Sequence, residues 1–201
     1  MGGMDAPKCI VLTGGPGGGK STLMRELRSE DPDAKQWLML PEIAPIVFTT
    51  GMDARCKTFQ RAVVRFQLAF EEVCTKAATA GQVVLCHRGT LDALAYWLSQ
   101  GWIEEEFFSM SGMDRREHFD RYAGVLHMQT TAINAKEHYL RWPDARRCES
   151  PEDAAEIDEL CSIAWAGHPR YSIIENQCGG WEQKSKLAHA FLGDLLCVDC
   201  D

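Results

Sequence analysis

The stretch Gly14-Gly15-Pro16-Gly17-Gly18-Gly19-Lys20-Ser21 decides the fold of this chain. It satisfies the pattern G-x-x-x-x-G-K-[ST] at every fixed position, and the apolar run Cys9-Ile10-Val11-Leu12 stands just before it. Glycines let backbone N–H groups approach a phosphate without a clash from Cβ, and a helix that begins at Lys20 adds its dipole. The stretch therefore predicts a phosphate-binding loop (P-loop) between a buried strand and a helix.

The P-loop also predicts which residues bind a nucleotide. Lys20 can reach the β- and γ-phosphates, and the hydroxyl of Ser21 can ligate Mg²⁺. The alternative, a Gly-rich turn that binds nothing, would leave the combination of strand, loop, lysine, serine and helix without a purpose. We expect a nucleoside triphosphate, ATP or GTP, to contact Gly15, Gly17, Gly18, Gly19, Lys20, Ser21 and Thr22.

Length and composition favour one globular domain over residues 1–201. Apolar residues make up 45% of the 201 residues, enough for a substantial core, and no linker divides the chain. The net charge of −8 argues against a nucleic-acid partner and favours a small anionic ligand. No secretory signal or membrane-spanning run is present, and nine scattered cysteines are typical of a reducing compartment. We therefore expect a cytoplasmic protein.

Apolar runs alternate with helical patterns, which predicts a doubly wound α/β domain with a parallel five-stranded sheet. The helix 57–80 should bury its apolar stripe, which includes Phe59, Phe66, Phe70 and Val73. The polar, arginine-bearing segment 131–166 reads as a helical lid inserted between the last two strands. The expected strands are 8–13, 37–40, 83–86, 125–128 and 171–174, and the other main helices are 19–28, 90–100 and 181–197.

The third strand departs from the usual pattern of P-loop proteins. An apolar strand that ends in Asp normally helps to hold Mg²⁺, but here His87 follows Val83 to Cys86, and imidazole suits Mg²⁺ poorly. Glu42 and Asp92 are the acids nearest to strand ends, and either could be a catalytic base or, for Asp92 in particular, a metal ligand beside Ser21. Arg88 is placed to clamp a phosphate or an acceptor, although a surface ion pair is the alternative.

These motifs resemble the small AAA-type P-loop ATPase/kinase-like family that includes the TRPL-translocation-defect protein. The resemblance runs from the P-loop through Pro41-Glu42 and Arg88-Gly89-Thr90-Leu91-Asp92, where family members usually show D-R-G. It ends on Trp165-Ala166-Gly167-His168-Pro169, Ile174-Glu175-Asn176 and Lys184. The family looks related to nucleoside, nucleotide and nicotinamide-riboside kinases.

The resemblance implies roles for several residues. Glu42 would be the general base, Arg88 would bind phosphate or acceptor, and Arg141, Arg146 or Arg147 of the lid would stabilise the transferring phosphoryl group. His168 would lie near the purine. Gln60 and Gln67, seven residues apart on one helix face, either hydrogen-bond an acceptor or are ordinary polar surface residues. The catalytic set is therefore Lys20, Glu42, Arg88, Asp92 and Arg147.

Two functions fit this set. The first is an ATP-dependent phosphotransferase that acts on a small hydroxylated, nucleoside-like acceptor with Mg²⁺. The alternative is an ATP- or GTP-binding regulatory protein with slow hydrolysis, which the loss of the acid at His87 would favour. The sequence does not identify the acceptor.

Overall fold

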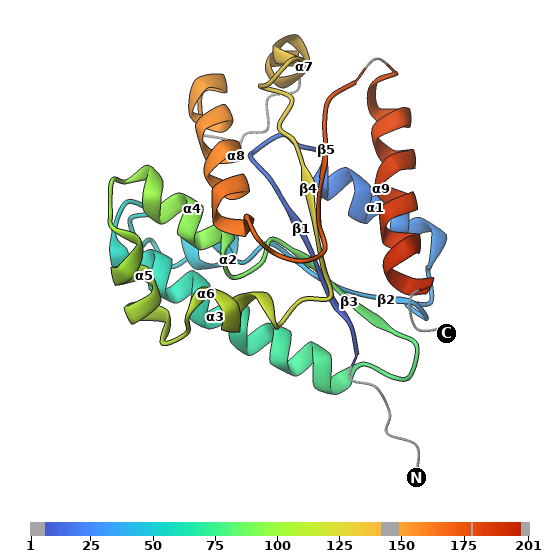
Figure 1. The fold of residues 1–201 in the computed structure, drawn as a ribbon, viewed down its shortest axis with the longest axis horizontal. Coiled ribbons are helices and arrows are strands. Elements are labelled where there is room, and N and C mark those ends of the chain that lie inside the picture. Colours follow the sequence, from blue (N-terminus) through green and yellow to red (C-terminus); the bar gives the residue numbers. More distant parts are fainter. Residues whose placement is uncertain (1–6, 142–148, 178, 198–201) are drawn as a thin grey trace.

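The computed structural model describes residues 7–141, 149–177 and 179–197. Its five strands form one parallel sheet in the order β2-β3-β1-β4-β5, with β1 in the centre (Figure 1). This arrangement confirms the expected five-stranded α/β fold. The strands are β1 (Cys9–Thr13), β2 (Trp37–Leu40), β3 (Val83–His87), β4 (Gly124–Met128) and β5 (Tyr171–Ile174).

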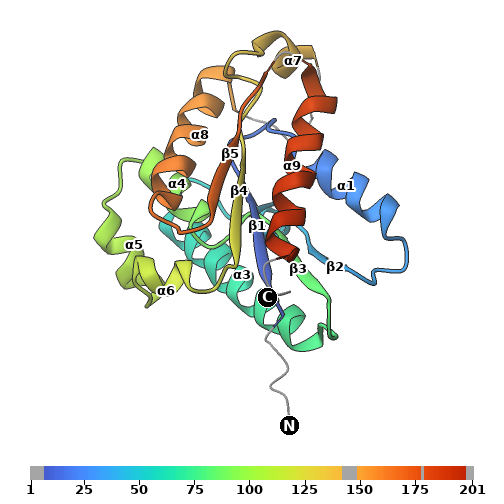
Figure 2. The same ribbon diagram turned by 45° about the vertical axis from the view of Figure 1, so that its right-hand side comes forward.

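Helices cover both faces of the sheet, as Figures 1 and 2 show. One face carries α1 and α9, and the other carries α3, α4 and α8. The three central strands are buried along their whole length, because a sheet covered on both sides needs apolar side chains on both. The helices are α1 (Lys20–Glu30), α2 (Ile43–Phe48), α3 (Lys57–Ala77), α4 (Asp92–Ser99), α5 (Glu104–Ser111), α6 (Arg115–Phe119), α7 (Lys136–Arg141), α8 (Pro151–Trp165) and α9 (Gly180–Cys197).

Alternate residues of each strand point into separate cores. In β1, Ile10 and Leu12 pack with α1 and α9, whereas Val11 packs with α3, α4 and α8. Because all strands run the same way, their carboxyl ends meet at one edge of the sheet. The P-loop, Glu42 and Arg88 follow β1, β2 and β3 at this edge, where ligands of open α/β sheets bind.

Helix α3 does not bury the stripe that its apolar residues predict. Phe59 is buried against Ile43 and Val47 of α2, but Phe66 is 57% exposed and Val73 is 61% exposed. The short helix α2 covers only the first turns of α3, so the stripe beyond it faces solvent. The buried face of α3 consists of Phe59, which belongs to the expected stripe, and of Gln60, Val64, Gln67 and Glu71, which do not.

The second half of the expected lid belongs to the body of the domain. Helix α8 packs on α4 through Ile157, Cys161 and Ala95, and its Trp165 is fully buried in the core. Apolar contacts therefore fix α8, the second half of the expected lid at 131–166, against the core. That the part before Pro151 acts as a lid stays a prediction, and Arg146 and Arg147 lie outside the described residues.

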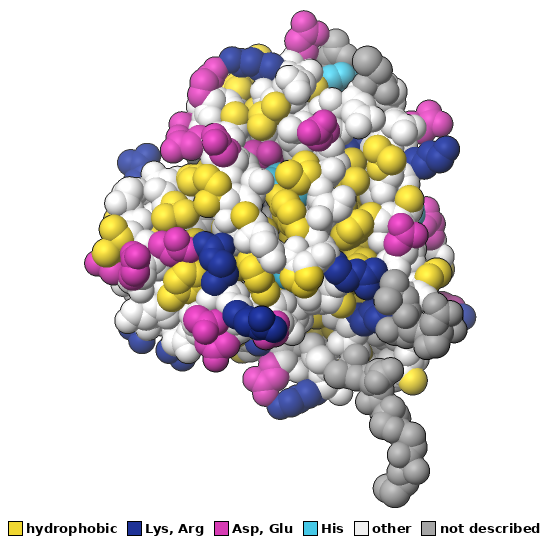
Figure 3. Space-filling model, viewed as in Figure 1, with side chains coloured by type: hydrophobic (Ala, Val, Ile, Leu, Met, Phe, Trp, Pro, Cys, Tyr) yellow, Lys and Arg dark blue, Asp and Glu magenta, His cyan; other side chains and the backbone are white. Residues whose placement is uncertain are grey.

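The edge strand β5 reaches the surface. Ile173 in β5 is 41% exposed and Ile163 in α8 is 49% exposed, and Figure 3 shows hydrophobic side chains at the surface over this part of the molecule. None of the helices in the described ranges is long and apolar enough to span a membrane.

Candidate functional site

Gly19 ends the P-loop in a conformation that requires glycine. Its φ is 96°, in the left-handed region, and a Cβ atom there would lie 2.3 Å from Cζ3 of Trp181 in α9. The first helical residue of α1 is Lys20. In this first turn the N–H groups of Thr22 and Leu23 donate to the carbonyl oxygen of Gly19 at 3.0 Å, which leaves those of Lys20 and Ser21 to receive an anion.

Lys20 folds back onto its own loop. Its Nζ donates to the carbonyl oxygens of Gly14 at 2.6 Å and Gly15 at 2.8 Å. Burial, with the positive charge of Arg88 nearby, lowers the pKa of Lys20 to about 8. The ammonium is thus held at the mouth of the loop by carbonyls that a phosphate can replace.

Ser21 contacts the histidine that stands where an acid was expected. Ser21 is exposed, and its Oγ lies 2.9 Å from Nε2 of His87. On the other side of the ring, Nδ1 lies 3.8 Å from Oε2 of Glu42. Burial lowers the pKa of His87 to about 4 although Glu42 acts to raise it, so the imidazole is neutral at pH 7.

Glu42 and Arg88 form an ion pair at the ends of neighbouring strands. Nε of Arg88 donates to Oε1 of Glu42 at 2.7 Å, and the Glu42 side chain is 31% exposed. Burial alone would raise the pKa of Glu42, but the positive charge of Arg88 and its neighbours holds it at about 2. Glu42 is therefore an ionised carboxylate that solvent can reach.

The guanidinium of Arg88 is fixed on several sides. Nη1 donates to the carbonyl oxygen of Gly14 at 3.1 Å and to Oδ1 of Asp92 at 2.9 Å. Nη2 donates to the hydroxyl of Tyr96 at 3.1 Å, a residue that sequence reasoning missed. Arg88 also has a φ of 74°, an unfavourable conformation for a residue with a Cβ.

Gln67 helps to hold this strained backbone. Its Nε2 donates to the carbonyl oxygen of Arg88 at 3.1 Å and to Oε1 of Glu71 at 2.8 Å. Glu71 in turn accepts from the hydroxyl of Tyr122 at 2.7 Å and pairs with Arg121. The polar face of α3 is thus buried, and its hydrogen bonds hold the backbone of Arg88 in place.

Asp92 is saturated by protein donors. Oδ1 accepts from Thr13 Oγ1 and Arg88 Nη1, both at 2.9 Å. Oδ2 accepts from the backbone N–H of Gly89 at 2.9 Å and from Nε1 of Trp165 at 3.2 Å. A carboxylate offers about four acceptor positions, so these four donors occupy them. The geometry gives Asp92 the task of orienting Arg88 and leaves little room for the expected metal or base role.

A second acid, which the sequence did not single out, contacts the P-loop directly. Oδ1 of Asp158 in α8 accepts from the backbone N–H of Gly15 at 2.6 Å and of Thr130 at 2.8 Å. Oδ2 lies 3.1 Å from Nε2 of His127. Burial acts to raise the pKa of Asp158, but His127 and the two N–H donors lower it. Asp158 thereby ties the P-loop to α8.

The structure does not bring His168 to this site. It precedes β5, and its Nε2 lies 3.0 Å from the carbonyl oxygen of Tyr122, which precedes β4. Since both strands are parallel to β1, these positions lie at the amino edge of the sheet, opposite the P-loop. At the P-loop edge, β5 is followed by Asn176, whose Oδ1 accepts a hydrogen bond from Nζ of Lys184 at 2.8 Å.

The other expected contacts are placed as follows. Thr22 is partly buried at the start of α1 and accepts from Nη2 of Arg25 at 3.3 Å. Arg147 lies outside the described residues, and so does the side chain of Arg141. Within the described ranges, no group of three His, Cys, Asp or Glu side chains could by itself hold a metal ion.

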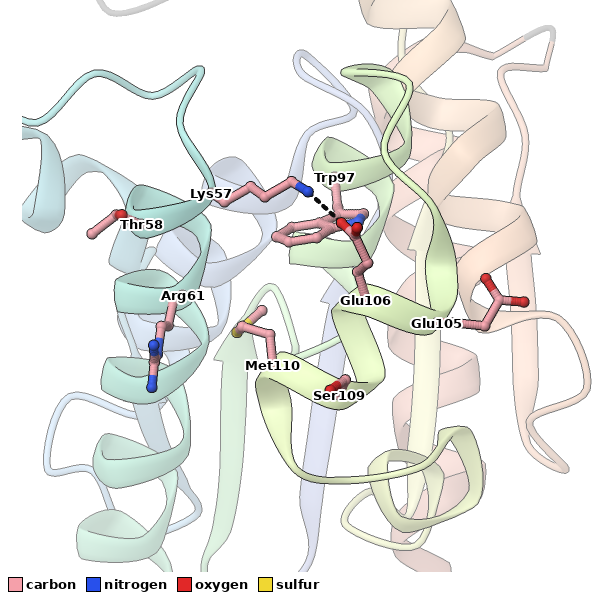
Figure 4. Close-up of a pocket in the computed structure, with 8 residues that line it drawn as sticks. All are labelled: Lys57, Thr58, Arg61, Trp97, Glu105, Glu106, Ser109 and Met110. Carbon is pink, nitrogen blue, oxygen red and sulfur yellow. Dashed lines mark hydrogen bonds and ion pairs between the residues drawn. The ribbon is translucent and has the colours of Figure 1, made fainter.

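A separate cleft of about 480 Å³ opens between α3, α4 and α5 (Figure 4). Lys57 pairs with Glu106 across it, and its Nζ lies 5.2 Å from the centre of the Trp97 ring. Its lining also includes Thr58, Arg61, Glu105, Ser109 and Met110. None of these is a P-loop residue or a neighbour of Arg88 in the contacts above, so the cleft is distinct from the candidate site.

The candidate site therefore combines a phosphate cradle with an acid and a fixed cation. The P-loop and Lys20 can bind phosphates, Ser21 offers a hydroxyl to a cation, and Arg88 and Glu42 lie beside them. This set can position a phosphoryl group and an attacking hydroxyl, which is most of what phosphoryl transfer needs.

Comparisons with known proteins agree with this fold. A search of curated proteins finds no match. The solved structure of the NadR protein in complex with NR is similar, with a TM-score of 0.68 at 17% sequence identity. The similarity covers 95% of this chain and 52% of the NadR chain, so this chain spans about half the length of that protein. At such low identity the likeness shows the fold alone.

The family comparison covers most of the sequence. A family model described as AAA domain matches residues 9–184, from the first residue of β1 to Lys184 in α9. The matched span includes the P-loop, Glu42 and Arg88, and it confirms the resemblance that the motifs suggested. The chain belongs to the AAA domain family.

Proposed function

We propose that this protein transfers the terminal phosphate of ATP to a hydroxyl group of a small, nucleoside-like acceptor. The observation that carries the proposal is the Glu42–Arg88 pair beside the P-loop, with 2.7 Å between the carboxylate and the guanidinium. A protein that only binds a nucleotide has no need for an accessible acid there, whereas an acid in that place can orient an attacking hydroxyl and receive its proton. The acceptor oxygen forms a bond to the γ-phosphorus, the bond to the β–γ bridging oxygen breaks, and the proton of the acceptor passes to Glu42.

Each residue has a role that its contacts support. Lys20 and Arg88 counter the charge of the phosphoryl group in transfer. Glu42 orients the acceptor hydroxyl and receives its proton late, because a carboxylate with a pKa of about 2 is a weak base. Asp92 and Gln67 hold Arg88 in position.

Gln60 is the best candidate for a direct contact with the acceptor. It lies two turns before Gln67 on the same buried face of α3, which places it about 10 Å further toward the carboxyl edge of the sheet. The residue is 5% exposed. An amide can both donate to and accept from a hydroxyl group, so Gln60 can pair with an acceptor that enters beside it.

Mg²⁺ fits one side of the site. The hydroxyl of Ser21 can donate its hydrogen to His87, which leaves its oxygen for the cation. Asp92 does not fit as a ligand because protein donors occupy its oxygens. When bound, Mg²⁺ would neutralise phosphate charge at Ser21.

A regulatory protein with slow hydrolysis is the second candidate. The neutral His87 in place of an acid favours it, because a site with less negative charge holds a cation more weakly.

A screen of hydroxylated metabolites and nucleosides for ATP consumption distinguishes the two functions. We expect one class of acceptor to raise ADP formation in the parent protein but not in Glu42→Gln. Slow hydrolysis that no acceptor accelerates, and that Glu42→Gln leaves unchanged, would support the regulatory protein instead.

A further inference from the structure

His87 lies between two groups that belong to different halves of the candidate site. Ser21 stands on the nucleotide side, 2.9 Å from Nε2. Glu42 stands on the acceptor side, with Oε2 3.8 Å from Nδ1. The His87 side chain is only 8% exposed, so both ring nitrogens face protein groups and not bulk water.

The neighbouring groups determine which nitrogen of the His87 ring carries the hydrogen. The carboxylate of Glu42 can only accept, so the hydrogen of a neutral ring belongs on Nδ1. Nε2 then carries a lone pair and accepts the hydroxyl hydrogen of Ser21. The oxygen of Ser21 keeps its own lone pairs for a cation, as it would if an aspartate were the acceptor.

His87 and Glu42 are too far apart to form a hydrogen bond in this structure. Nδ1 of His87 is buried and has no hydrogen-bond partner among the described residues, while Oε1 of Glu42 is held by Arg88 at 2.7 Å. The other oxygen of Glu42, Oε2, faces Nδ1, so a small shift of Glu42 toward His87 would satisfy Nδ1. Glu42 therefore has a partner for each oxygen, and one of them is a buried donor that lacks an acceptor.

We propose that His87 is a positioning residue that links the two halves of the site, by orienting the Ser21 hydroxyl for the metal and by drawing Oε2 of Glu42 toward Nδ1. The inference rests on the proposed function for its acceptor side only. On the metal side it concerns nucleotide binding, which requires no transfer. A cation at Ser21 polarises the hydroxyl, strengthens its bond to Nε2 and makes Nδ1 a better donor to Glu42.

A matched pair of variants distinguishes the role of Nε2 of His87 from that of Nδ1. The amide of Gln reaches about as far as Nε2, so His87→Gln keeps a partner for Ser21. The amide of Asn reaches only about as far as Nδ1, so His87→Asn loses that partner. The readout is the affinity for a non-hydrolysable ATP analogue, measured by calorimetry over a range of Mg²⁺ concentrations.

We expect His87→Asn to need about tenfold more Mg²⁺ than the parent for half-maximal nucleotide affinity, as the loss of one well-placed hydrogen bond implies. His87→Gln should stay within about threefold, and His87→Asp should need less Mg²⁺ than the parent because it adds a negative charge. If His87→Asn matches the parent, or His87→Asp has no effect, the metal side of the proposal is wrong. Melting temperatures of the nucleotide-free proteins identify a variant that fails to fold. If His87→Asn fails to fold, the Mg²⁺ requirement of His87→Asp tests the metal side of the proposal.

The link to Glu42 is tested by a double-mutant cycle with the same readout. Glu42→Gln should change the Mg²⁺ requirement about threefold in the parent and not in the His87→Asn background. An equal change in both backgrounds would mean that Glu42 acts on the metal directly, and the link would be refuted. Because no variant is tested by turnover, absence of phosphotransfer would overturn the proposed function and leave the metal side of this inference standing.

Discussion

Oδ1 of Asp92 lies 2.9 Å from Nη1 of Arg88, one helical turn away, and this contact directs the guanidinium toward the P-loop. Arg88 reaches the carbonyl oxygen of Gly14 through the same nitrogen. Since the other donors around Asp92 belong to the fold, the carboxylate joins the core of the domain to the guanidinium of Arg88.

Asp92→Asn should therefore lower both stability and turnover. An amide nitrogen in place of one oxygen faces a donor, and a disrupted buried ion pair costs about 3–5 kcal/mol. Thermal unfolding and ATP turnover measure the two effects. Excess Mg²⁺ should not restore turnover, whereas it should partly restore Ser21→Ala by mass action. Rescue of Asp92→Asn by Mg²⁺ would return Asp92 to the role of metal ligand.

Glu42→Gln should keep nucleotide affinity within a few-fold of the parent and lose turnover by about 100-fold, the usual scale for a lost proton acceptor. The amide still accepts a hydrogen bond from Arg88 but takes no proton. Single-turnover phosphate transfer at several Mg²⁺ concentrations is the measurement, with Glu42→Asp as the control that keeps the charge. Parent-like turnover in Glu42→Gln would contradict the phosphotransferase mechanism.

Lys20→Ala should abolish tight triphosphate binding while the fold survives. Its partners are two carbonyl oxygens of the loop, which water can satisfy after the change. Calorimetric titration with ATP and with GTP tests binding, and circular dichroism tests the fold. Unchanged affinity for both nucleotides would show that the P-loop does not bind phosphates as its sequence indicates.

Gln60→Leu should raise the KM for the acceptor by about tenfold and leave nucleotide affinity unchanged, because the proposed role of Gln60 is to pair with the acceptor. Gln67→Leu is the matched control on the same helix face. It removes the donor to the carbonyl oxygen of Arg88, so it should lower kcat and stability instead. Identical effects of the two changes would mean that Gln60 is also a structural residue.

His118 should make the protein less stable in mild acid. The ring is fully buried, with Nδ1 2.9 Å from Thr90 Oγ1 and Nε2 3.2 Å from Ser111 Oγ. Burial lowers its pKa from 6.5 to about 4. The unfolded chain binds a proton near pH 6.5 and the folded chain does not, so this contribution is complete above pH 6.5 and is lost as pH falls toward 4.

Denaturant unfolding of the parent and of His118→Gln between pH 7.5 and 4.5 isolates this contribution. The variant should be less stable at pH 7.5, and the difference should shrink as the pH falls. Other buried histidines, such as His87, titrate in both proteins and cancel in the comparison. A difference that stays constant with pH would rule out His118 as the titrating group.

The sequence predicted the sheet and the P-loop because their signals are local. Glycine positions, a lysine and an apolar run of four residues are sufficient to place β1 and α1. Likewise Glu42 and Arg88 were found because both follow apolar strands, and parallel strands bring such positions together.

The predictions that failed depend on which other elements pack against a residue. Local sequence patterns do not contain this information. The apolar stripe of α3 is real, but α2 ends before it reaches Phe66. His168 stands near the last strand in sequence, yet at its amino end. Tyr96 and Asp158 lie on helices without a motif, and only the packing of α4 and α8 brings them to Arg88 and Gly15.

The hydrogen bond between Asp158 and Gly15 affects the order in which the elements of the domain fold. The two residues are 143 positions apart, and the hydroxyl of Thr130 also reaches the carbonyl oxygen of Pro16 from 114 positions away. Such distant contacts form late, because closing a long loop carries an entropic cost. During synthesis, a nascent chain that ends before Pro151 already holds the whole glycine motif but lacks the carboxylate that shapes it. On this argument, the P-loop would bind nucleotide only after α8 has docked. The segments β1 and α1 would leave the ribosome well before that point.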